Sequence, residues 1–467
     1  MKSKIPTIII FICMISMFSF SCKKFVQIDP APDMISADAV FTSDKTALSA
    51  VNGVYLAMRE AGRFITNGGL SIYCGLAADD IRNLNSNPNY DPFYTNNLLP
   101  TFTVMQNAFW ATAYRNIYRT NAIIEGIDKS TLMSDSVKKQ LKGEMKVVRA
   151  LYYFYMANLF GDVPLVITTD YEKNASLPRT TVTEIYEQIV SDLTDAKDLL
   201  KTTYPSANRV RPNRYTATAL LARVYLYMKD WANAEAQASI VIDNISTYKL
   251  ATPTQNGAHM RTIFLIASNE TIWQIAPSNE SLNTDEGAVF VPSGSSPSFA
   301  ATTNLLNTFD SGDLRKTRWL RPYGSTYVPY KDTLRTATTP IGEYNIVLRI
   351  AEQYLIRAEA KAQRNNLSGA QADLNAIRVR SGLSPNNPPS TQTLMLSAVE
   401  KERQVELFAE WGHRWLDLKR TGRIGDVLGP IKGLTSGVPN FEMHDALFPI
   451  PQTELDRNPF LTQNPGY

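Results

Sequence analysis

The side chains that could carry out acid–base or metal chemistry are few and widely spaced in this chain of 467 residues. The three histidines, His259, His413 and His444, belong to no metal-binding motif, and no Cys-x-x-Cys, Gly-x-Ser-x-Gly or phosphate-binding glycine loop occurs. Glu406 and Glu410 could form a catalytic carboxylate pair, although their spacing also fits ion pairs along one helix. We therefore expect no enzymatic activity, no cofactor and no metal, and we keep a surface hydrolase as an alternative.

Cys22 is the cysteine whose position has the clearest chemical consequence. Two lysines precede an apolar stretch, residues 8–20, which is too short to span a membrane, and the small residue Ser21 lies directly before the cysteine. This order is similar to a bacterial lipoprotein signal. We expect residues 1–21 to be removed, the Cys22 thiol to be lipidated, and residues 22–40 to act as a tether. An ordinary secretory signal cleaved near Ser21 is the alternative.

The remaining cysteine and the net charge exclude other classes of protein. Cys13 lies in the leader, so Cys74 is the one thiol left besides Cys22 and cannot be part of a disulfide framework. We expect Cys74 to be a small buried hydrophobic residue. Without the two lysines of the leader, 47 basic residues become 45, against 44 acidic ones. This balance gives no electrostatic reason to expect nucleic-acid binding.

Apolar residues at spacings of three and four predict a mainly α-helical protein. We interpret residues 41–467 as one domain, with a helical scaffold at 41–245 and 343–422, a loop-rich insertion with minor β-structure at 246–342, and an irregular tail at 436–467. A short strand is expected at residues 271–275, where apolar and polar residues alternate. The expected helices are 42–62, 108–127, 136–160, 181–201, 213–229, 231–245, 343–364, 368–381 and 393–420.

Two of these segments share an internal pattern. Ala222 and Ala234 lie twelve residues apart across a polar turn, as do Ala358 and Ala370. This spacing is typical of tetratricopeptide repeats, where small residues let two antiparallel helices cross closely. Because the insertion separates the two copies, we expect the helical array to be interrupted. Chance spacing in alanine-rich helices is the alternative.

The segment 399–420 is predicted to be one continuous helix with an aromatic face. Its apolar residues recur every three or four positions, and Glu410 and Arg414 are spaced for an ion pair along the helix. We favour a packing role for this helix over a catalytic one. The residues of the apolar face are Val405, Phe408, Trp411, Trp415 and Leu418.

Five stretches together resemble the SusD/RagB family of outer-membrane nutrient-binding lipoproteins. The most specific are ERQVELFAEWGHRWLDLKRTG at 402–422 and LFPIPQTELDRNPFLTQNPGY at 447–467. The other three are helical, at 148–165, 214–234 and 348–362, and all five occur in the order typical of the family. The resemblance therefore covers most of the mature chain.

This resemblance implies a SusD-like fold: a scaffold of tetratricopeptide-like helix pairs with a loop-rich ligand-binding region. It also implies a non-catalytic protein, anchored by lipid in the outer membrane and exposed at the cell surface, that acts as a lid on a TonB-dependent SusC-like barrel. Family members bind oligosaccharides or, in some branches, peptides. Lys23 and Lys24 follow the predicted lipidated cysteine where exported relatives often carry acidic residues, so the leaflet stays open.

In this family the ligand is held mainly by loops, and two loops here combine aromatic rings with amide, carboxylate and guanidinium groups. Sugars place C–H faces on such rings and hydroxyls on such polar groups, and peptides could use the same side chains. The alternatives are that the rings contact the barrel or cover apolar patches, or that the chain is a tetratricopeptide adaptor for periplasmic proteins. The predicted ligand-binding residues are Asn83, Asn89, Tyr90, Asp91, Tyr94, Trp319, Arg321, Tyr323 and Tyr327.

Overall fold

The computed structural model describes residues 37–60, 62–277, 283–294, 296–336, 341–435, 438–439 and 441–467. The predicted leader, Cys22 and most of the predicted tether lie outside these residues. Within them, no helix combines the length and the apolar character that crossing a bilayer requires. The prediction of a mainly α-helical protein with small amounts of β-structure is confirmed.

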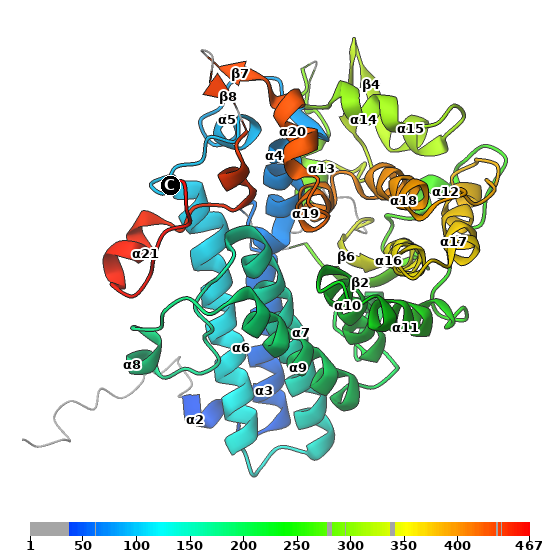
Figure 1. Ribbon diagram of the computed structural model, residues 1–467. Coiled ribbons are helices and arrows are strands. Elements are labelled where there is room, and N and C mark those ends of the chain that lie inside the picture. The colour runs from blue at the N-terminus through cyan, green and yellow to red at the C-terminus, as the bar shows by residue number, and fades with distance from the viewer. Residues whose placement is uncertain are drawn as a thin grey trace, which may run out of the picture.

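The N-terminal half is a bundle of long helices that lie side by side (Figure 1). α7 ends at Gly161, as the sequence predicts, because this glycine adopts a φ of +75° without a steric penalty. α9 begins with a capping box in which Thr181 and Glu184 bond each other's backbone N–H groups. The helices of the bundle are α2 (Ala37–Val40), α3 (Asp44–Met58), α6 (Ala111–Lys129), α7 (Asp135–Phe160) and α9 (Val182–Leu199).

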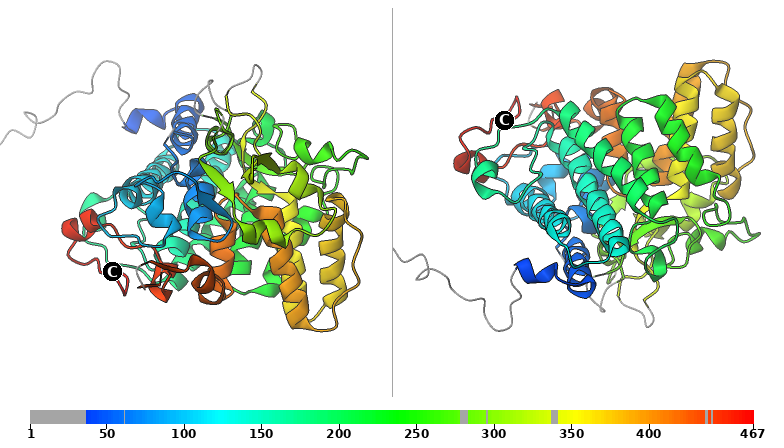
Figure 2. Two further views of the ribbon diagram at one scale, coloured as in Figure 1. Left: turned by 90° about the horizontal axis from the view of Figure 1, so that it is seen from above. Right: turned by 90° about the horizontal axis from the view of Figure 1, so that it is seen from below.

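Two helical hairpins carry the predicted repeat. The first consists of α10 (Arg214–Tyr227) and α11 (Trp231–Ile242), and the second of α16 (Ile350–Gln363) and α17 (Leu367–Arg380). The four alanines of the repeat pattern are all fully buried. α11 packs directly against α16, as the right-hand view of Figure 2 shows. The prediction that the helical array is interrupted is therefore wrong for the folded protein. The insertion separates the two hairpins in sequence, but the chain returns so that the second hairpin packs next to the first.

The predicted continuous helix at 393–420 is two helices, α18 (Gln392–Leu407) and α19 (His413–Arg420). Between them Ala409, Trp411 and Gly412 adopt left-handed backbone conformations, with φ of 54°, 47° and 70°. The turn lets the Trp411 indole donate a hydrogen bond to the carbonyl of Ile346 at 2.7 Å. Long-range bonding thus outweighs the local helical pattern.

This break also changes the predicted ion pair. Glu410 accepts hydrogen bonds from Lys331 and Arg349, whereas Arg414 donates to Asp79 at 2.7 Å. The predicted Glu410–Arg414 pair is therefore wrong. The five apolar residues predicted to pack are all buried, so the packing role of the segment is confirmed.

All the strands are short and pair antiparallel. The strand predicted at 271–275 is confirmed as β2 and pairs with β6, which occupies the start of the helix expected at 343–364. The other sheets join β1 to β3, β4 to β5 and β7 to β8. The strands are β1 (Ile81–Asn83), β2 (Thr271–Ile275), β3 (Phe299–Ala301), β4 (Leu320–Tyr323), β5 (Thr326–Pro329), β6 (Asn345–Arg349), β7 (Leu434–Thr435) and β8 (Val438–Pro439).

Short helices connect these larger elements, and Cys74 at the end of one of them is fully buried, as predicted. The main apolar core joins the N-terminal bundle to the first hairpin, β2 and the C-terminal tail, and a second core surrounds Trp319. The connecting helices are η2 (Ile65–Cys74), α4 (Gly75–Ala77), α5 (Asp91–Tyr94), η3 (Met105–Trp110), α8 (Tyr171–Asn174), η4 (Ala207–Arg209), α12 (His259–Thr262), α13 (Asp285–Phe290), α14 (Thr303–Thr308), α15 (Leu314–Arg318), α20 (Ile424–Lys432), η5 (Met443–Ala446) and α21 (Gln452–Arg457).

Candidate functional site

The two loops predicted to hold a ligand lie at the same end of the molecule, the upper end in Figure 1, and are linked through β3. β1 begins the first loop and pairs with β3, and β3 in turn packs against β5 of the hairpin that carries the second loop. The ring of Phe299 on β3 makes an edge-to-face contact with Tyr90, with centroids 5.0 Å apart. We call this end the loop face and define it as residues 83–94 and 319–330.

Asp91 holds the first loop in shape. Its carboxylate accepts hydrogen bonds from the side chain of Asn83, from the hydroxyl of Ser86 at 2.7 Å and from the backbone N–H of Asn87 at 2.9 Å. The carboxylate oxygens are therefore used within the loop. Asp91 and Asn83, both predicted to contact the ligand, instead position the loop, and Asn89 is left with its side chain exposed to solvent.

The two tyrosines of the first loop face inward. Tyr90 is buried against Phe299, and the guanidinium of Arg63 lies 5.8 Å from its ring centroid. Burial raises the pKa of the Tyr90 hydroxyl, although the charge of Arg63 lowers it in part. Tyr94 is half-buried, with the Lys432 ammonium 4.9 Å from its ring centroid. These contacts leave little of either ring for a ligand.

Trp319 does not belong to the surface, contrary to the prediction. Its side chain is 1% exposed, and the indole N–H donates a hydrogen bond to the carbonyl of Met260 at 2.9 Å. The ring lies between Phe264, at 5.4 Å between centroids, and the Lys331 ammonium, at 4.7 Å from the centroid. The ring of Trp319 is therefore not available to a ligand, and it instead packs in the second core, where it supports the hairpin.

The β4–β5 hairpin carries the most accessible of the predicted residues. Its register pairs Tyr323 with Thr326 and Pro322 with Tyr327, so Arg321 and Tyr323 share one face of the hairpin and Tyr327 points to the other. The guanidinium of exposed Arg321 lies 5.2 Å from the ring centroid of Tyr330. The hydroxyl of half-buried Tyr323 donates a hydrogen bond to the carbonyl of Gly294.

The predicted set thus divides into two groups. Asn83, Tyr90, Asp91 and Trp319 build the loop face from inside, and Tyr94 lies at its border. On the loop face, the side chains of Asn89 and Arg321 are exposed, and those of Tyr323, Tyr327 and Tyr330 are half-buried, with Tyr327 packed against the second core.

Two carboxylates of the insertion, Glu286 and Asp332, have raised pKa values. Burial raises the pKa of Glu286 to about 7, and it raises the pKa of Asp332 well above its usual range, with Glu286 and Glu343 adding to the effect. The cavity that these two side chains line has a volume of about 20 Å³. This space holds no more than about one water molecule, so the cavity is too small for a sugar ring.

The histidines do not form a site in the described part of the chain. His259 is buried and bonds the carbonyl of Arg380 at 2.7 Å, whereas burial lowers the pKa of His413 to about 4. His444 pairs with Asp445 near the C-terminal tail. In the ranges that the structure describes, no three His, Cys, Asp or Glu side chains are arranged to hold a metal ion.

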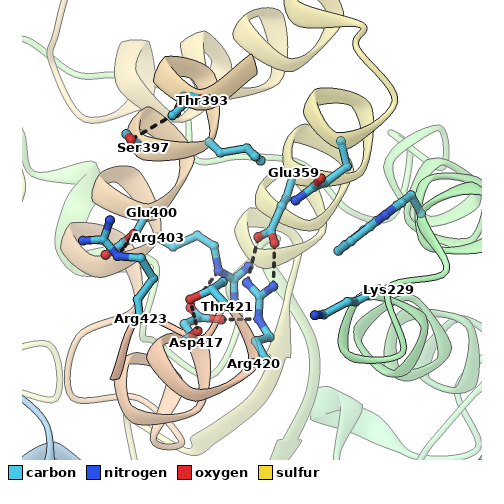
Figure 3. Close-up of a pocket in the computed structure, with 13 residues that line it drawn as sticks. Lys229, Glu359, Thr393, Ser397, Glu400, Arg403, Asp417, Arg420, Thr421 and Arg423 are labelled. Atoms are coloured by element: carbon cyan, nitrogen blue, oxygen red, sulfur yellow. Dashed lines mark hydrogen bonds and ion pairs between the residues drawn. The ribbon is translucent and has the colours of Figure 1, made fainter. Parts of the chain in front are cut away.

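Sequence reasoning missed a cleft between the two repeat hairpins and the α18–α19 segment, with a volume of about 390 Å³ (Figure 3). Trp231, at the turn of the first repeat hairpin, is half-buried against the main core and also lines this cleft. Trp110 and Trp273 are instead buried in the main core. The turn Lys229-Asp230-Trp231, with its cation and its aromatic ring, was the feature of the sequence that could have indicated this cleft. The sequence does not reveal, however, that the second hairpin faces this turn.

Comparison with known proteins adds to this geometry. A family model described as "Starch-binding associating with outer membrane" matches residues 69–226, and one described as "SusD family" matches residues 248–467. SusD-like protein P25 of Formosa agariphila is 25% identical, covering 99% of this chain and 100% of the relative. SusD-like protein P2 of the same organism is 27% identical, covering 78% and 81%.

Solved structures share the fold. A SusD superfamily protein from Bacteroides vulgatus superposes with a TM-score of 0.78 at 22% identity, covering 91% of this chain and 99% of that one. A laminarin-binding SusD-like protein superposes with a TM-score of 0.75 at 24% identity, covering 91% and 100%. The helical scaffold and the small sheets described above are therefore an architecture that known proteins share.

Proposed function

The chain belongs to the SusD family, and from this membership we propose that it is a non-catalytic glycan-binding lipoprotein of the outer membrane. In this proposal it passes its ligand to a TonB-dependent, SusC-like barrel. The relative described as laminarin-binding supports a glycan ligand, because it has the same fold. A family model described as associating with the outer membrane supports the location.

The observation that carries the proposal is the accessible part of the loop face. Arg321 and Tyr330 form a flat pair in which the guanidinium covers the phenol ring, and Tyr323 is fixed beside them by its bond to Gly294. Flat surfaces of this kind accept the C–H faces of sugar rings, while Asn89 and Arg321 offer hydrogen-bond donors to hydroxyls. The supporting shell of Asp91 and Trp319 keeps the surface in place before ligand arrives, which lowers the entropic cost of binding.

The accessible groups predict weak binding. Each ring stack contributes about 1 kcal/mol beyond the burial of its area. A few such contacts give a Kd between about 1 mM and about 1 μM, which corresponds to roughly −4 to −8 kcal/mol. Such an affinity suits a protein that must release its ligand to a channel.

Titration of the soluble protein tests the ligand class. We would replace Cys22 by serine and measure calorimetric binding of neutral β-glucan oligosaccharides and of mixed oligopeptides. Tyr323→Ala should weaken glycan binding about tenfold, because it removes a ring stack and the bond that fixes it. The matched control is Tyr171→Ala, since Tyr171 is 76% exposed and lies on α8, far from the loop face in Figure 1.

Two outcomes would contradict the proposal. Saturable peptide binding without any glycan binding would assign the scaffold to peptide uptake, and turnover of a glycan by the purified protein would make it a hydrolase. The anchor and the partner need separate tests: mass spectrometry of the N-terminal peptide for an acylated Cys22, and co-purification of a large barrel from solubilised outer membranes. Recovery of soluble periplasmic proteins instead of a barrel would favour the adaptor alternative.

A further inference from the structure

The cleft of Figure 3 is built by the helical scaffold and not by the loops. Its walls come from the turn before α11, from α16, from α18 and from the end of α19, and no residue of the loop face lines it. Its volume of about 390 Å³ falls in the range of small-ligand sites, which is about 300–1,000 Å³. The cleft is therefore large enough to hold a ligand of its own.

The acidic residues of the cleft are already neutralised. Glu359 receives two hydrogen bonds from Arg420, one of them at 2.7 Å. Asp417 accepts from Arg403 and from Arg420, both at 2.8 Å. Although burial raises the pKa of Asp417, these two guanidinium groups lower it further and hold it well below its usual range, so the carboxylate stays ionised and paired.

The basic residues are not all used in this way. The lining contains four cations, at positions 229, 403, 420 and 423, against three anions, at 359, 400 and 417, which leaves an excess of one positive charge. The side chain of Lys229 is exposed and makes no ion pair within the described ranges. Arg423 is 49% exposed and contacts Glu400 only at 3.5 Å. Figure 3 shows these two cations on opposite sides of the cleft.

Arg403 provides a second, independent sign of a ligand. The residue is 2% exposed, and its Nε donates to Asp417, but neither its Nη1 nor its Nη2 has an acceptor among the residues that the structure describes. Each buried donor that lacks an acceptor costs about 1–3 kcal/mol of free energy. An anionic oxygen at the inner end of the cleft would offset this cost.

The rest of the lining suits a sugar better than a peptide. Trp231 supplies an aromatic surface and Leu396 a small apolar one, and three hydroxyls, those of Thr393, Ser397 and Thr421, line the cleft as well. A peptide would need more apolar surface for its side chains or an unpaired strand edge for its backbone. A pyranose ring needs one aromatic face and several polar partners.

We propose that this cleft is a second saccharide subsite, selective for an anionic sugar unit that carries a carboxylate or a sulfate group. Lys229 and Arg423 would contact the anionic group from two sides, and Trp231 would contact the ring. The inference rests on the proposed function only in assuming a glycan ligand. It adds a charge specificity that the loop face, with Arg321 as its single accessible cation, does not explain.

The test uses three oligosaccharides of about four units: a neutral β-glucan, an oligogalacturonate and a sulfated oligosaccharide without uronate. The double variant Lys229→Gln/Arg423→Gln should weaken binding of an anionic oligosaccharide at least tenfold at 50 mM salt and leave neutral binding unchanged. Both positions are exposed, so the variant should fold, and an unchanged unfolding midpoint without ligand checks this. Which anionic oligosaccharide responds identifies carboxylate or sulfate as the preferred group.

A matched control removes the same charges elsewhere. Lys45→Gln/Arg457→Gln replaces an exposed lysine on α3 and an arginine that is 73% exposed on α21, so nonspecific attraction of an anion should fall equally in both double variants. Equal affinity of the cleft variant and the control would overturn the proposal, as would the absence of anionic binding by the parent protein. Binding of an acidic peptide, but of no anionic sugar, in the cleft would overturn the ligand class.

The two proposals fail in different ways. If Tyr323→Ala abolishes neutral binding while the cleft variant changes nothing, the proposed function holds and the second subsite is lost. If anionic binding depends on Lys229 and Arg423 while no neutral glycan binds, the cleft holds and the role of the loop face is lost.

Discussion

Around Glu406, near the end of α18, all the charged groups are buried and paired, whereas on the loop face Arg321 and Asn89 lie exposed with few partners. Glu406 accepts hydrogen bonds from Arg315, Arg349 and Arg380. Burial raises the pKa of its carboxyl, but these cations lower it further and hold it well below the usual range. The loop face uses the same types of side chain with their hydrogen-bonding groups directed to solvent. Polar residues thus stabilise the fold where they satisfy one another and can serve recognition where they do not.

The Glu406 network, formed by Glu406, Arg315, Arg349, Arg380 and Lys331, also explains how the insertion is fastened. Arg315 lies in the first turn of α15 in the insertion, Arg349 ends β6, and Arg380 ends α17, so one carboxylate joins three segments far apart in sequence. Asp313 caps α15 and pairs with Arg315, which fixes the orientation of the guanidinium. The loop face rests on this fastened insertion through Trp319, whose ring lies 5.2 Å from the Arg380 guanidinium.

The largest effect is expected from Glu406→Gln. The amide cannot neutralise three buried guanidinium groups, so the free energy of unfolding should fall by about 3–5 kcal/mol. Denaturant unfolding measures this loss. The control is Glu187→Gln on α9, an exposed glutamate for which we expect a change within about 0.5 kcal/mol. A loss below about 1 kcal/mol for Glu406→Gln would show that the network contributes little to stability.

A second prediction concerns pH and the buried carboxylate of Glu286. Burial raises the pKa of Glu286 from 4.5 to about 7, and Asp285 and Glu410 add to the shift. Because the folded pKa lies above the unfolded one, this group favours the folded state fully below about pH 4.5, and the contribution is lost as the pH rises through about 7. The shift corresponds to about 3 kcal/mol.

Glu286→Gln should remove this dependence while keeping the acceptor for the Ser71 hydroxyl, which bonds Glu286 at 2.9 Å. Relative to the parent protein, the variant should therefore gain about 3 kcal/mol in stability between pH 4.5 and pH 8. Urea unfolding of both proteins at these two pH values provides the measurement. The test uses the difference in stability between the two proteins, and not the stability of either one alone. Lys419, whose pKa is lowered to about 7, shifts the stability of both proteins in the opposite direction, and this shift cancels in the difference. A difference that does not vary with pH would refute the assignment.

The contrast between the two regions also explains what could be predicted from the sequence. The helices, the strand at 271–275 and the alanine positions of the repeat follow local periodicity, which the sequence displays directly. The break at Ala409, Trp411 and Gly412 follows from a hydrogen bond to Ile346, more than sixty residues away. Such a partner leaves no periodic signal near the break.

The candidate site was predictable by region but not by residue. Composition correctly separated the polar, aromatic loops from the helices, and the structure brings the two loops together through β3. Composition could not show that Trp319 points into the core toward Met260. It also could not show that the carboxylate oxygens of Asp91 accept hydrogen bonds from its own loop. A tryptophan or an aspartate in the sequence looks the same whether it supports the fold or binds a ligand. Only the long-range packing of the folded chain distinguishes the two roles.

A third prediction separates support from contact within the first loop. Asp91→Ala removes three hydrogen bonds from a partly exposed loop, so we expect a loss of about 1–2 kcal/mol that is confined to residues 83–94. Hydrogen exchange should speed up for these amides and leave the hairpins of the scaffold unchanged. Asp198→Ala, at an exposed residue of α9, is a suitable comparison. Global destabilisation by Asp91→Ala would show that the loop and the scaffold unfold together.

The smallest effect on stability, and the sharpest on the comparison, is expected from Arg321→Gln. Arg321 is exposed, and within the described residues its guanidinium covers the Tyr330 ring and donates a hydrogen bond of 3.4 Å to the Tyr330 hydroxyl. Its replacement should change the free energy of unfolding by less than about 0.5 kcal/mol and weaken neutral glycan binding about threefold to fivefold, since a cation–π pair at an exposed site contributes about 0.5–1 kcal/mol. Arg457→Gln, at a similarly exposed arginine on α21, should change neither quantity. A loss of stability as large as that expected for Glu406→Gln would contradict this prediction. The Arg321 guanidinium would then stabilise the fold, and the distinction between a paired interior and an available surface would not hold at the hairpin.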